Sequence, residues 1–147
     1  MLLAKQITHL DKDIALQISK LWLRIPQNTS TLKEYLQYIY SRWERIALFG
    51  VFDGDRLIAY THAEPPHPLD KEVAFLPFSS GLPQCPRKMA ETALSLAEQW
   101  MSLRGAKRWK METLRNPEAM ARKWGLKVLS DEIPMGRDIN VENAKNL

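Results

Sequence analysis

Apolar residues recur at helical spacing in two segments near the start of the chain, after a short apolar run at residues 3–8 that predicts a strand. The first segment begins at Asp11 and ends before Pro26, which cannot continue a helix. The second begins at Thr31, whose capping-box spacing to Glu34 satisfies free backbone donors at a helix start. The apolar stripes of the two predicted amphipathic helices are Ile14, Ile18, Leu21, Trp22 and Ile25, and Leu32, Leu36, Ile39, Trp43 and Ile46.

The hydrophobic pattern then changes to that of strands. Residues 47–52 and 56–62 are apolar runs on either side of Asp53-Gly54-Asp55, and Asp-Gly between such runs predicts a hairpin because glycine tolerates a positive φ. Residues 72–78 predict a third strand, in which Pro77 indicates a sheet edge, a bulge or the end of the strand. The Pro-rich segment 64–68 predicts a loop between strands, since proline lacks the N–H that a ladder needs.

The last third of the chain alternates helices and strands. A helix with Pro86 at its first position is predicted to end near Gly105, and its apolar stripe is Met89, Ala93, Leu96, Ala97 and Trp100. A strand over residues 108–114, a short helix from Asn116 to Gly125 and a strand from residue 127 follow. The order β-α-α-β-β-β-α-β-α-β predicts an α/β (α+β) fold with a central sheet flanked by helices.

Composition indicates one domain. The chain has 147 residues, 45% of them hydrophobic, and no linker divides it, so we expect a single domain over residues 1–147 with residues 139–147 as a flexible tail. The single cysteine, Cys85, excludes an internal disulfide, and with three histidines it leaves no recognisable metal site. No apolar run is long enough to span a bilayer, so we expect a cytoplasmic protein without a membrane partner.

Positive charge is concentrated in one part of the chain. Residues 1–84 carry nine basic and nine acidic residues, whereas residues 85–127 carry ten basic against four acidic residues. This excess indicates either an anionic partner or a set of solvated helix faces, and charge alone does not decide between them. A nucleic acid is not the expected partner, because no aromatic-basic or helix-turn-helix pattern accompanies the charge.

The element order and two short motifs resemble the GNAT superfamily of acetyl-CoA-dependent N-acyltransferases. The motifs are Gly105-Ala106-Lys107, between a helix and a strand, and the helix led by Asn116 that ends in Trp124-Gly125-Leu126-Lys127. The resemblance implies a GNAT-like mixed sheet in which residues 47–78 form antiparallel strands and the strand near Trp109 runs parallel to residues 72–78. It also implies a cofactor cleft where these last two strands splay apart, near Phe78 and Leu114.

The same resemblance implies an activity. The protein would bind acetyl-CoA, or another acyl-CoA, and acylate a primary amine of a small molecule or a peptide. The neutral amine would attack the thioester directly, without a covalent enzyme intermediate, and a homodimer is compatible with the family. The alternative is a protein that retains the fold without turnover and binds CoA or a macromolecular partner.

The cofactor residues implied by the resemblance surround the start of the third predicted helix: Phe78, Gln84, Arg87, Lys88, Met89 and Ala90, with Asn116 further along. The family's pyrophosphate loop, Q/R-x-x-G-x-G/A, falls on residues 85–90, where only Ala90 fits. Gln84 lies one position early, and Lys88 stands where a glycine normally lets a backbone amide approach the pyrophosphate. Arg87 and Lys88 either supply charge to the phosphates directly or are two exposed cations on a first turn.

Three residues are candidates for acid–base chemistry. Glu72 lies at the start of the strand that lines the acyl-transfer cleft in this family, where a partly desolvated carboxylate can accept the amine's proton; a solvated start of a strand is the alternative. His62 ends the neighbouring strand and is a candidate base or a structural residue. Tyr60, on the same face as His62, can donate a proton or simply pack. The tyrosine that many family members use as general acid has no counterpart between Asn116 and Gly125.

Overall fold

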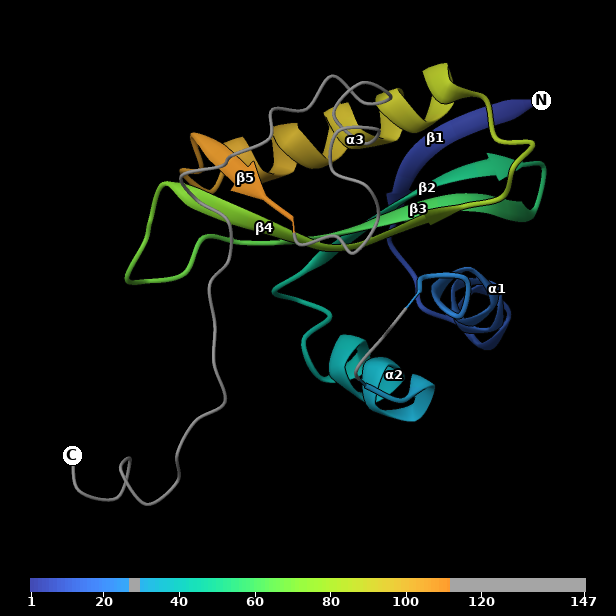
Figure 1. The fold of residues 1–147 in the computed structure, drawn as a ribbon, viewed down its shortest axis with the longest axis horizontal. Coiled ribbons are helices and arrows are strands. Elements are labelled where there is room, and N and C mark those ends of the chain that lie inside the picture. The colour runs from blue at the N-terminus through green and yellow to red at the C-terminus, as the bar shows by residue number, and fades with distance from the viewer. Residues whose placement is uncertain (27–29, 112–147) are drawn as a thin grey trace. The chain divides into compact units, whose positions relative to one another are not determined.

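The protein is built around a mixed β-sheet, seen in a computed structural model of the chain (Figure 1). The structure describes residues 1–26 and 30–111, all within one compact unit, Met1–Leu114. Neighbouring strands from β1 to β4 are antiparallel, whereas β4 and β5 are parallel, which confirms the predicted direction of the strand near Trp109. The strands lie side by side in chain order: β1 (Leu2–Ile7), β2 (Ala47–Asp53), β3 (Arg56–Glu64), β4 (Val73–Gly81) and β5 (Arg108–Lys110).

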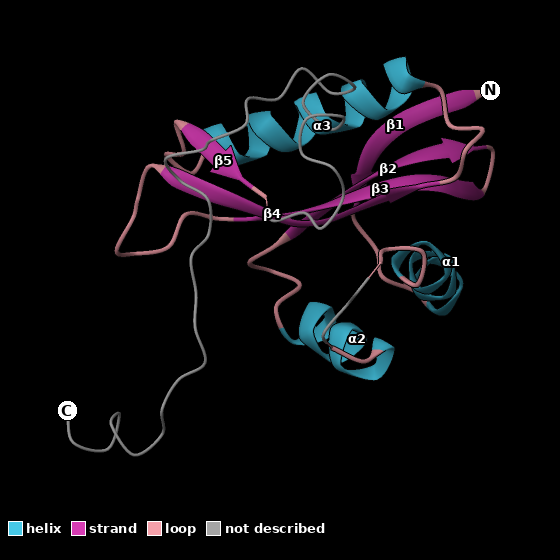
Figure 2. Ribbon diagram, in the orientation of Figure 1, coloured by secondary structure: helices cyan, strands magenta, loops and turns pink. Residues whose placement is uncertain are grey.

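Helices cover both faces of this sheet (Figure 2). α1 (Lys12–Trp22) and α2 (Leu32–Ser41) lie on one face and share a core cluster with Leu48 of β2 and Tyr60 of β3. α3 (Arg87–Ser102) lies on the other face and packs on Ala63 of β3 and Leu76 of β4. Because both faces are covered, β2 and β3 are buried at nearly every position rather than at alternate ones.

The start of α2 agrees with the sequence, but its end does not. The Thr31 hydroxyl accepts from the Glu34 N–H at 3.1 Å, and the Glu34 carboxylate accepts from the Thr31 N–H at 2.8 Å, which confirms the capping box. The prediction that this helix extends to Ile46 is wrong, because α2 ends at Ser41. Arg42 has φ −116° and ψ 15°, and the turn that follows leads to Ile46, which is buried just before β2. The apolar character of Ile46 therefore reflects tertiary packing rather than helix continuation.

The predicted hairpin joins β2 and β3. Asp53 pairs with Arg56 across a turn of two residues, in which Gly54 has a φ of +61°. A side chain at this position would strain the backbone, so the Asp-Gly signal has a direct structural cause.

A bulge at Pro77 decides which way the second half of β4 faces. Glu64 pairs with Phe75 and His62 with Phe78, so β4 has one more residue than β3 in this interval. Before the bulge, Leu76 packs in the cluster under α3; after it, Phe78 contacts Tyr35 of α2. Simple alternation would put Leu76 and Phe78 on the same face. Of the three readings for Pro77, the bulge is the one confirmed, and it turns Phe78 toward α1 and α2.

The start of α3 agrees with the sequence to within one residue, and the helix ends at Ser102, shortly before the expected stop at Gly105. Pro86 is the N-cap rather than the first helical residue, which is Arg87, and Gly105 follows the helix with a φ of +92°. Lys107 and Arg108 both donate backbone N–H groups to the carbonyl of Glu72, which joins the start of β5 to the start of β4.

Several predictions fall outside the described residues. These are the helix from Asn116 to Gly125, the strand from residue 127, the tail 139–147 and the splaying of strands at Leu114. No helix of the described segments is both long and apolar enough to cross a membrane.

Candidate active site

The residues singled out in the sequence separate into three groups. Tyr60, His62 and Phe78 lie together on the sheet face that α1 and α2 cover. Gln84 and residues 87–90 lie at the start of α3, which covers the other face. Glu72 lies immediately before β4, and Asn116 lies outside the described residues.

A pocket of about 330 Å³ lies on the face of α1 and α2. Its walls are rigid aromatic surfaces: the Tyr35 ring stacks on Trp22 with centroids 5.0 Å apart and meets Phe78 edge-on at 4.9 Å. Tyr35 and Tyr38 both face the pocket because residues three apart share one side of a helix. Glu64 and Phe78 reach it from neighbouring strands, across the bulge. The lining residues are Ser30, Glu34, Tyr35, Tyr38, Glu64 and Phe78.

Five polar side chains form a chain of contacts that leads from the core to this pocket. The Tyr60 hydroxyl donates to Tyr35 Oη at 3.2 Å, and Tyr35 Oη lies 3.1 Å from Nδ1 of His62. Nε2 of His62 lies 3.9 Å from Oε1 of Glu64, and the Tyr38 hydroxyl donates to the same oxygen. The His62 side chain is fully buried, whereas the Glu64 side chain is 23% exposed. Of these contacting side chains, Glu64 is therefore the one at the pocket end of the series, where a ligand can reach it.

The contacts of His62 assign its tautomer. Because Tyr60 donates to Tyr35, the Tyr35 proton is directed to Nδ1 of His62, which accepts it. Nε2 then carries the ring hydrogen; it lies 3.9 Å from Oε1 of the negative Glu64 and has no hydrogen-bond partner among the described residues. The expectation that His62 is itself the substrate's base is not met, since its ring is enclosed. It acts on the pocket only through Glu64.

Glu64 carries the negative charge at the inner end of the pocket. Burial alone would raise the pKa of its carboxyl, but the interactions with His62 and Tyr38 and the positive charge of Arg42 outweigh burial and hold the pKa below its usual value. The Arg42 guanidinium lies 5.0 Å from the centre of the Tyr38 ring. The Glu64 carboxylate is therefore ionised at neutral pH.

The three tyrosines around this carboxylate remain protonated. Burial raises the pKa of Tyr38 to about 12, and the hydrogen bond and charge of Glu64 add to the effect. Burial also raises the pKa of Tyr35 and of Tyr60. Tyr60 is 2% exposed and its hydroxyl reaches Tyr35 rather than the pocket. Of its two expected roles, the structure supports packing and the orientation of Tyr35, not proton donation to a substrate.

Glu72 does not belong to this site. Its carboxylate forms an ion pair with Lys107 at 3.1 Å, and its side chain is 64% exposed. The partly desolvated carboxylate expected there is therefore contradicted, and the alternative, a solvated start of a strand, is what the structure shows. The physical reason is that β5 begins beside Glu72 and brings Lys107 to it.

The start of α3 combines backbone donors with positive side chains. Pro86 gives the helix start no side-chain cap, which suits the binding of an anion to the first turn. Arg87 pairs with Glu91 at 3.0 Å, whereas Lys88 is exposed and forms no ion pair with the described residues. Met89 packs on the cluster beneath α3, Ala90 is half-buried, and Gln84 is exposed. Lys88 is therefore the cation most available to a phosphate group.

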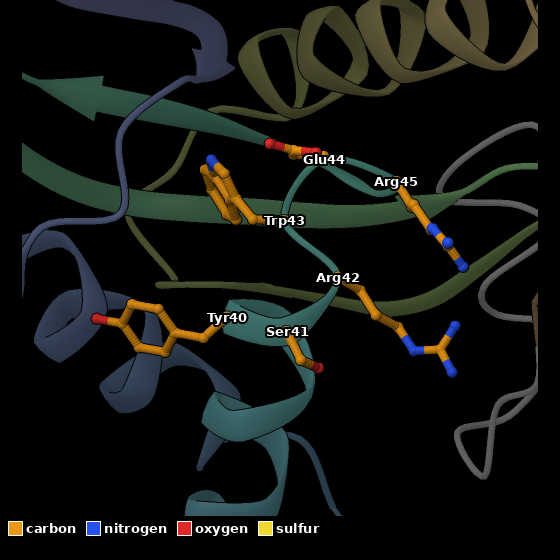
Figure 3. A pocket seen from close by; sticks show the side chains of 6 residues that line it. All are labelled: Tyr40, Ser41, Arg42, Trp43, Glu44 and Arg45. Atoms are coloured by element: carbon orange, nitrogen blue, oxygen red, sulfur yellow. The ribbon is translucent and has the colours of Figure 1, made fainter.

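A second hollow, of about 660 Å³, lies where the chain turns from α2 toward β2 (Figure 3). It is lined by six consecutive residues, 40–45, whose side chains diverge: Arg42 and Arg45 point to one side and Tyr40 to the other. Binding sites usually have polar groups that converge from several elements, so this hollow is a weaker candidate. No cluster of His, Cys, Asp or Glu within residues 1–26 and 30–111 is arranged to hold a metal ion.

Comparison with known proteins found similarity in fold. No protein-family model and no curated protein sequence matches the chain. The aminoglycoside acetyltransferase AAC(6')-Iy, solved with the bisubstrate analogue CoA-S-monomethyl-acetylneamine, is 14% identical, with 95% of this chain and 99% of that chain covered and a TM-score of 0.72. AAC(6')-Ih from Acinetobacter baumannii is 15% identical, with 95% of this chain and 100% of that chain covered and a TM-score of 0.72. A predicted acetyltransferase from Clostridium acetobutylicum, solved with acetyl-CoA, is 15% identical, with 92% of this chain and 96% of that chain covered and a TM-score of 0.68.

The chain has the GNAT fold. At this level of identity the likeness lies in the arrangement of elements, so the chemistry of this GNAT fold has to be argued from its own side chains.

Of the residues that line the pocket, the sequence predicts Phe78, as a cofactor residue, but not Glu64, Tyr35 or Tyr38 as site residues. Glu64 continues the alternation of Tyr60 and His62 along β3, a signal that was outweighed because Glu64 opens a Pro-rich segment. Tyr35 lies one helical turn before Ile39 and belongs to the buried stripe of α2, together with its neighbour across the turn, Tyr38. A search for polar groups at the buried and half-buried positions of β3 and α2 would have found Glu64 and the two tyrosines.

Proposed function

We propose that the protein is an acyl-CoA-dependent N-acyltransferase, which transfers an acetyl or other acyl group to a primary amine. The observation that carries the proposal is the course of β4. Phe78 on this strand forms a wall of the pocket that contains Glu64, and the chain continues from β4 directly into the start of α3. β4 thus connects the acidic pocket, which suits an amine, with the start of α3, which suits the phosphates of a donor. This arrangement suits a reaction between the two.

The proteins of similar fold support the choice of donor. One was solved with a CoA-containing bisubstrate analogue and another with acetyl-CoA. In this chain the uncapped first turn of α3 and the exposed ammonium of Lys88 fit the charge of a pyrophosphate. The side chain at position 88 prevents the close backbone approach that a glycine would allow, so side-chain charge takes over part of that role.

The residues of the pocket have defined roles in this proposal. When bound, acetyl-CoA would supply an acyl carbon that bonds to the amine nitrogen as the carbon–sulfur bond breaks, with the sulfur leaving as a thiolate that takes a proton from solvent. Glu64 attracts the ammonium form of the amine and accepts the proton that the nitrogen loses, and its low pKa lets the proton pass on to solvent. β4 pairs with the described part of β5 only from Val73 to Phe75, so backbone N–H groups further along β4 suit polarisation of the thioester carbonyl.

Calorimetry on the full chain tests the proposal, with acetyl-CoA, CoA and dephospho-CoA as titrants. We expect micromolar binding of acetyl-CoA and CoA, followed by release of free thiol when amines are added. The panel of acceptors comprises polyamines, aminoglycosides, amino acids, peptides and simple aromatic amines. Failure of both CoA and acetyl-CoA to bind would contradict the proposal.

The second candidate is a protein that keeps this fold without turnover. Two observations favour it: Lys88 replaces the glycine of the phosphate loop, and Arg87 is already paired with Glu91. Binding of CoA without thiol release for any acceptor of the panel would support this second candidate.

A further inference from the structure

The two oxygens of the Glu64 carboxylate have different surroundings. Oε1 accepts from the Tyr38 hydroxyl and faces Nε2 of His62. Oε2 has no hydrogen-bond partner among the described residues, and 23% of the Glu64 side chain is exposed. Oε2 is not among the buried unpartnered side-chain atoms of the described residues, so it is accessible from the solvent side of the pocket. Glu64 is thus oriented through one oxygen while the other can receive a ligand.

The nearest cation does not neutralise this carboxylate. Arg42 lies over the ring of Tyr38 and forms no ion pair with Glu64 within the described residues. A second acidic side chain, Glu34, lines the same pocket, held in place by the Thr31 N–H. The pocket is therefore negative and suits a cationic group.

The remaining surface of the pocket is aromatic. The rings of Tyr35, Tyr38 and Phe78 form its walls, and both tyrosine hydroxyls are engaged with other protein groups, with His62 and Tyr60 or with Glu64. Aromatic faces attract both apolar groups and ammonium cations. A polyhydroxylated ligand would need many polar partners, and apart from the two tyrosines only Ser30, Glu34 and Glu64 among the described lining residues carry a polar side chain.

We infer that this pocket binds one primary ammonium group carried on an aromatic or apolar skeleton, with Oε2 of Glu64 as its anionic partner. The inference rests on the proposed function only in that the bound amine is the acyl acceptor. Binding of the amine itself follows from the pocket and requires no acyl-CoA. Tyr38 and His62 are positioning residues, since they act on the ligand through Glu64.

Ligand-observed NMR titration of the full chain at neutral pH tests this inference, without acyl-CoA. The probes are 2-phenylethylamine, its uncharged analogue 2-phenylethanol and the polycationic sugar neamine. We expect 2-phenylethylamine to bind at least tenfold more tightly than 2-phenylethanol, and neamine to bind no more tightly than 2-phenylethylamine. Equal binding of the amine and the alcohol, or binding of neamine alone, would overturn the inference. This comparison uses the unaltered protein, so it does not depend on any variant folding.

Variants identify the anionic partner. Glu64→Gln keeps the shape and removes the charge, and we expect it to weaken 2-phenylethylamine binding about ten- to hundredfold, the loss of one charged hydrogen bond. Tyr38→Phe, which leaves Oε1 without its hydroxyl donor, should weaken binding by a smaller factor. Glu44→Gln is the matched control, because Glu44 is an exposed carboxylate of the other hollow, and it should leave binding unchanged. Unchanged binding in Glu64→Gln would refute the assignment.

CoA calorimetry on the same preparation separates the inference from the proposed function. Binding of 2-phenylethylamine without binding of CoA would leave the amine pocket standing and remove the acyltransferase proposal. Binding of CoA without binding of 2-phenylethylamine would have the opposite meaning.

Discussion

Glu64 and Glu72 are both carboxylates at the ends of strands, but their neighbours give them different chemistry. Glu72 is exposed and paired with the cation of Lys107, so its charge is largely neutralised. Glu64 is oriented by the hydroxyl of Tyr38, with Nε2 of His62 3.9 Å from the same oxygen and Arg42 held over the Tyr38 ring. A carboxylate oriented by a neutral hydroxyl donor instead of a contacting cation keeps its attraction for a ligand. For these two glutamates, the group that contacts the carboxylate, a hydroxyl or a cation, decides whether the carboxylate can attract a ligand.

The lowered pKa of Glu64 predicts how stability depends on pH. Since the folded-state pKa lies below the unfolded value of about 4.3, the charge of Glu64 contributes stability above that value and loses its contribution as pH falls through the folded pKa. We expect the unfolding free energy to fall less steeply below about pH 4.3 in Glu64→Gln than in the unaltered protein. Urea denaturation at a series of pH values measures this, with Glu44→Gln as control. Parallel profiles would mean that Tyr38 and His62 do not stabilise the Glu64 charge.

The side chain of Lys88 predicts the strength and salt dependence of CoA binding. We expect Lys88→Ala to weaken CoA binding about ten- to hundredfold, as for the loss of one charged hydrogen bond, and to leave the remaining affinity less sensitive to salt. Arg87→Ala should have a smaller effect, because Arg87 is paired with Glu91. Calorimetry at two salt concentrations measures both, with Lys20→Ala on α1 as control.

Lys88→Gly tests the reason for that effect. If the lysine supplies a phosphate contact, Lys88→Gly weakens binding as Lys88→Ala does. Tighter binding in Lys88→Gly would show that the side chain only obstructs a glycine loop, and the proposed contact would be wrong.

The sequence predicts best those structural features that depend on a few residues close together in the chain. The capping box at Thr31, the hairpin at Gly54 and the bulge at Pro77 each depend on a few neighbouring residues, and each is present. The end of α2 depends on where the chain must enter β2, and the pocket depends on side chains from three elements. Tyr60 and His62 were placed on one face by their spacing alone, but their enclosure by α2 and Phe78 is a tertiary feature that no local pattern contains.

The capping box predicts the stability of the helix that carries the pocket tyrosines. Thr31→Ala removes the hydroxyl that accepts from the Glu34 N–H, and we expect it to lower the unfolding free energy by about 0.5–2 kcal/mol. Because Tyr35 and Tyr38 lie on α2, the same change should also weaken amine binding. Urea denaturation and amine titration measure the two effects. Ser102→Ala, at the exposed end of α3, is the control and should change stability by less than about 0.5 kcal/mol.

For the molecule as a whole, the sheet separates the two groups of functional residues. The amine pocket lies on the face covered by α1 and α2, and α3 packs on the opposite face. β4 takes part in both, because the bulge at Pro77 turns Leu76 toward α3 and Phe78 toward the pocket. Two ligands that meet at one strand but are held by different layers can bind independently, so each should stabilise the fold in the absence of the other.

Ligand-induced stabilisation is the measurement that tests this arrangement. A ligand that binds only the folded state at about one hundred times its Kd adds about 2.7 kcal/mol to the unfolding free energy. For a chain of 147 residues this corresponds to a rise in Tm of about 5–10 °C. We expect CoA alone and 2-phenylethylamine alone each to raise Tm, and the two increases in Tm to add when both ligands are present. Lys88→Ala should lower only the increase caused by CoA, and Glu64→Gln only the increase caused by 2-phenylethylamine. A variant that lowered both increments would show that the two sites are coupled through β4, and a missing increment with CoA would remove the donor site from the start of α3.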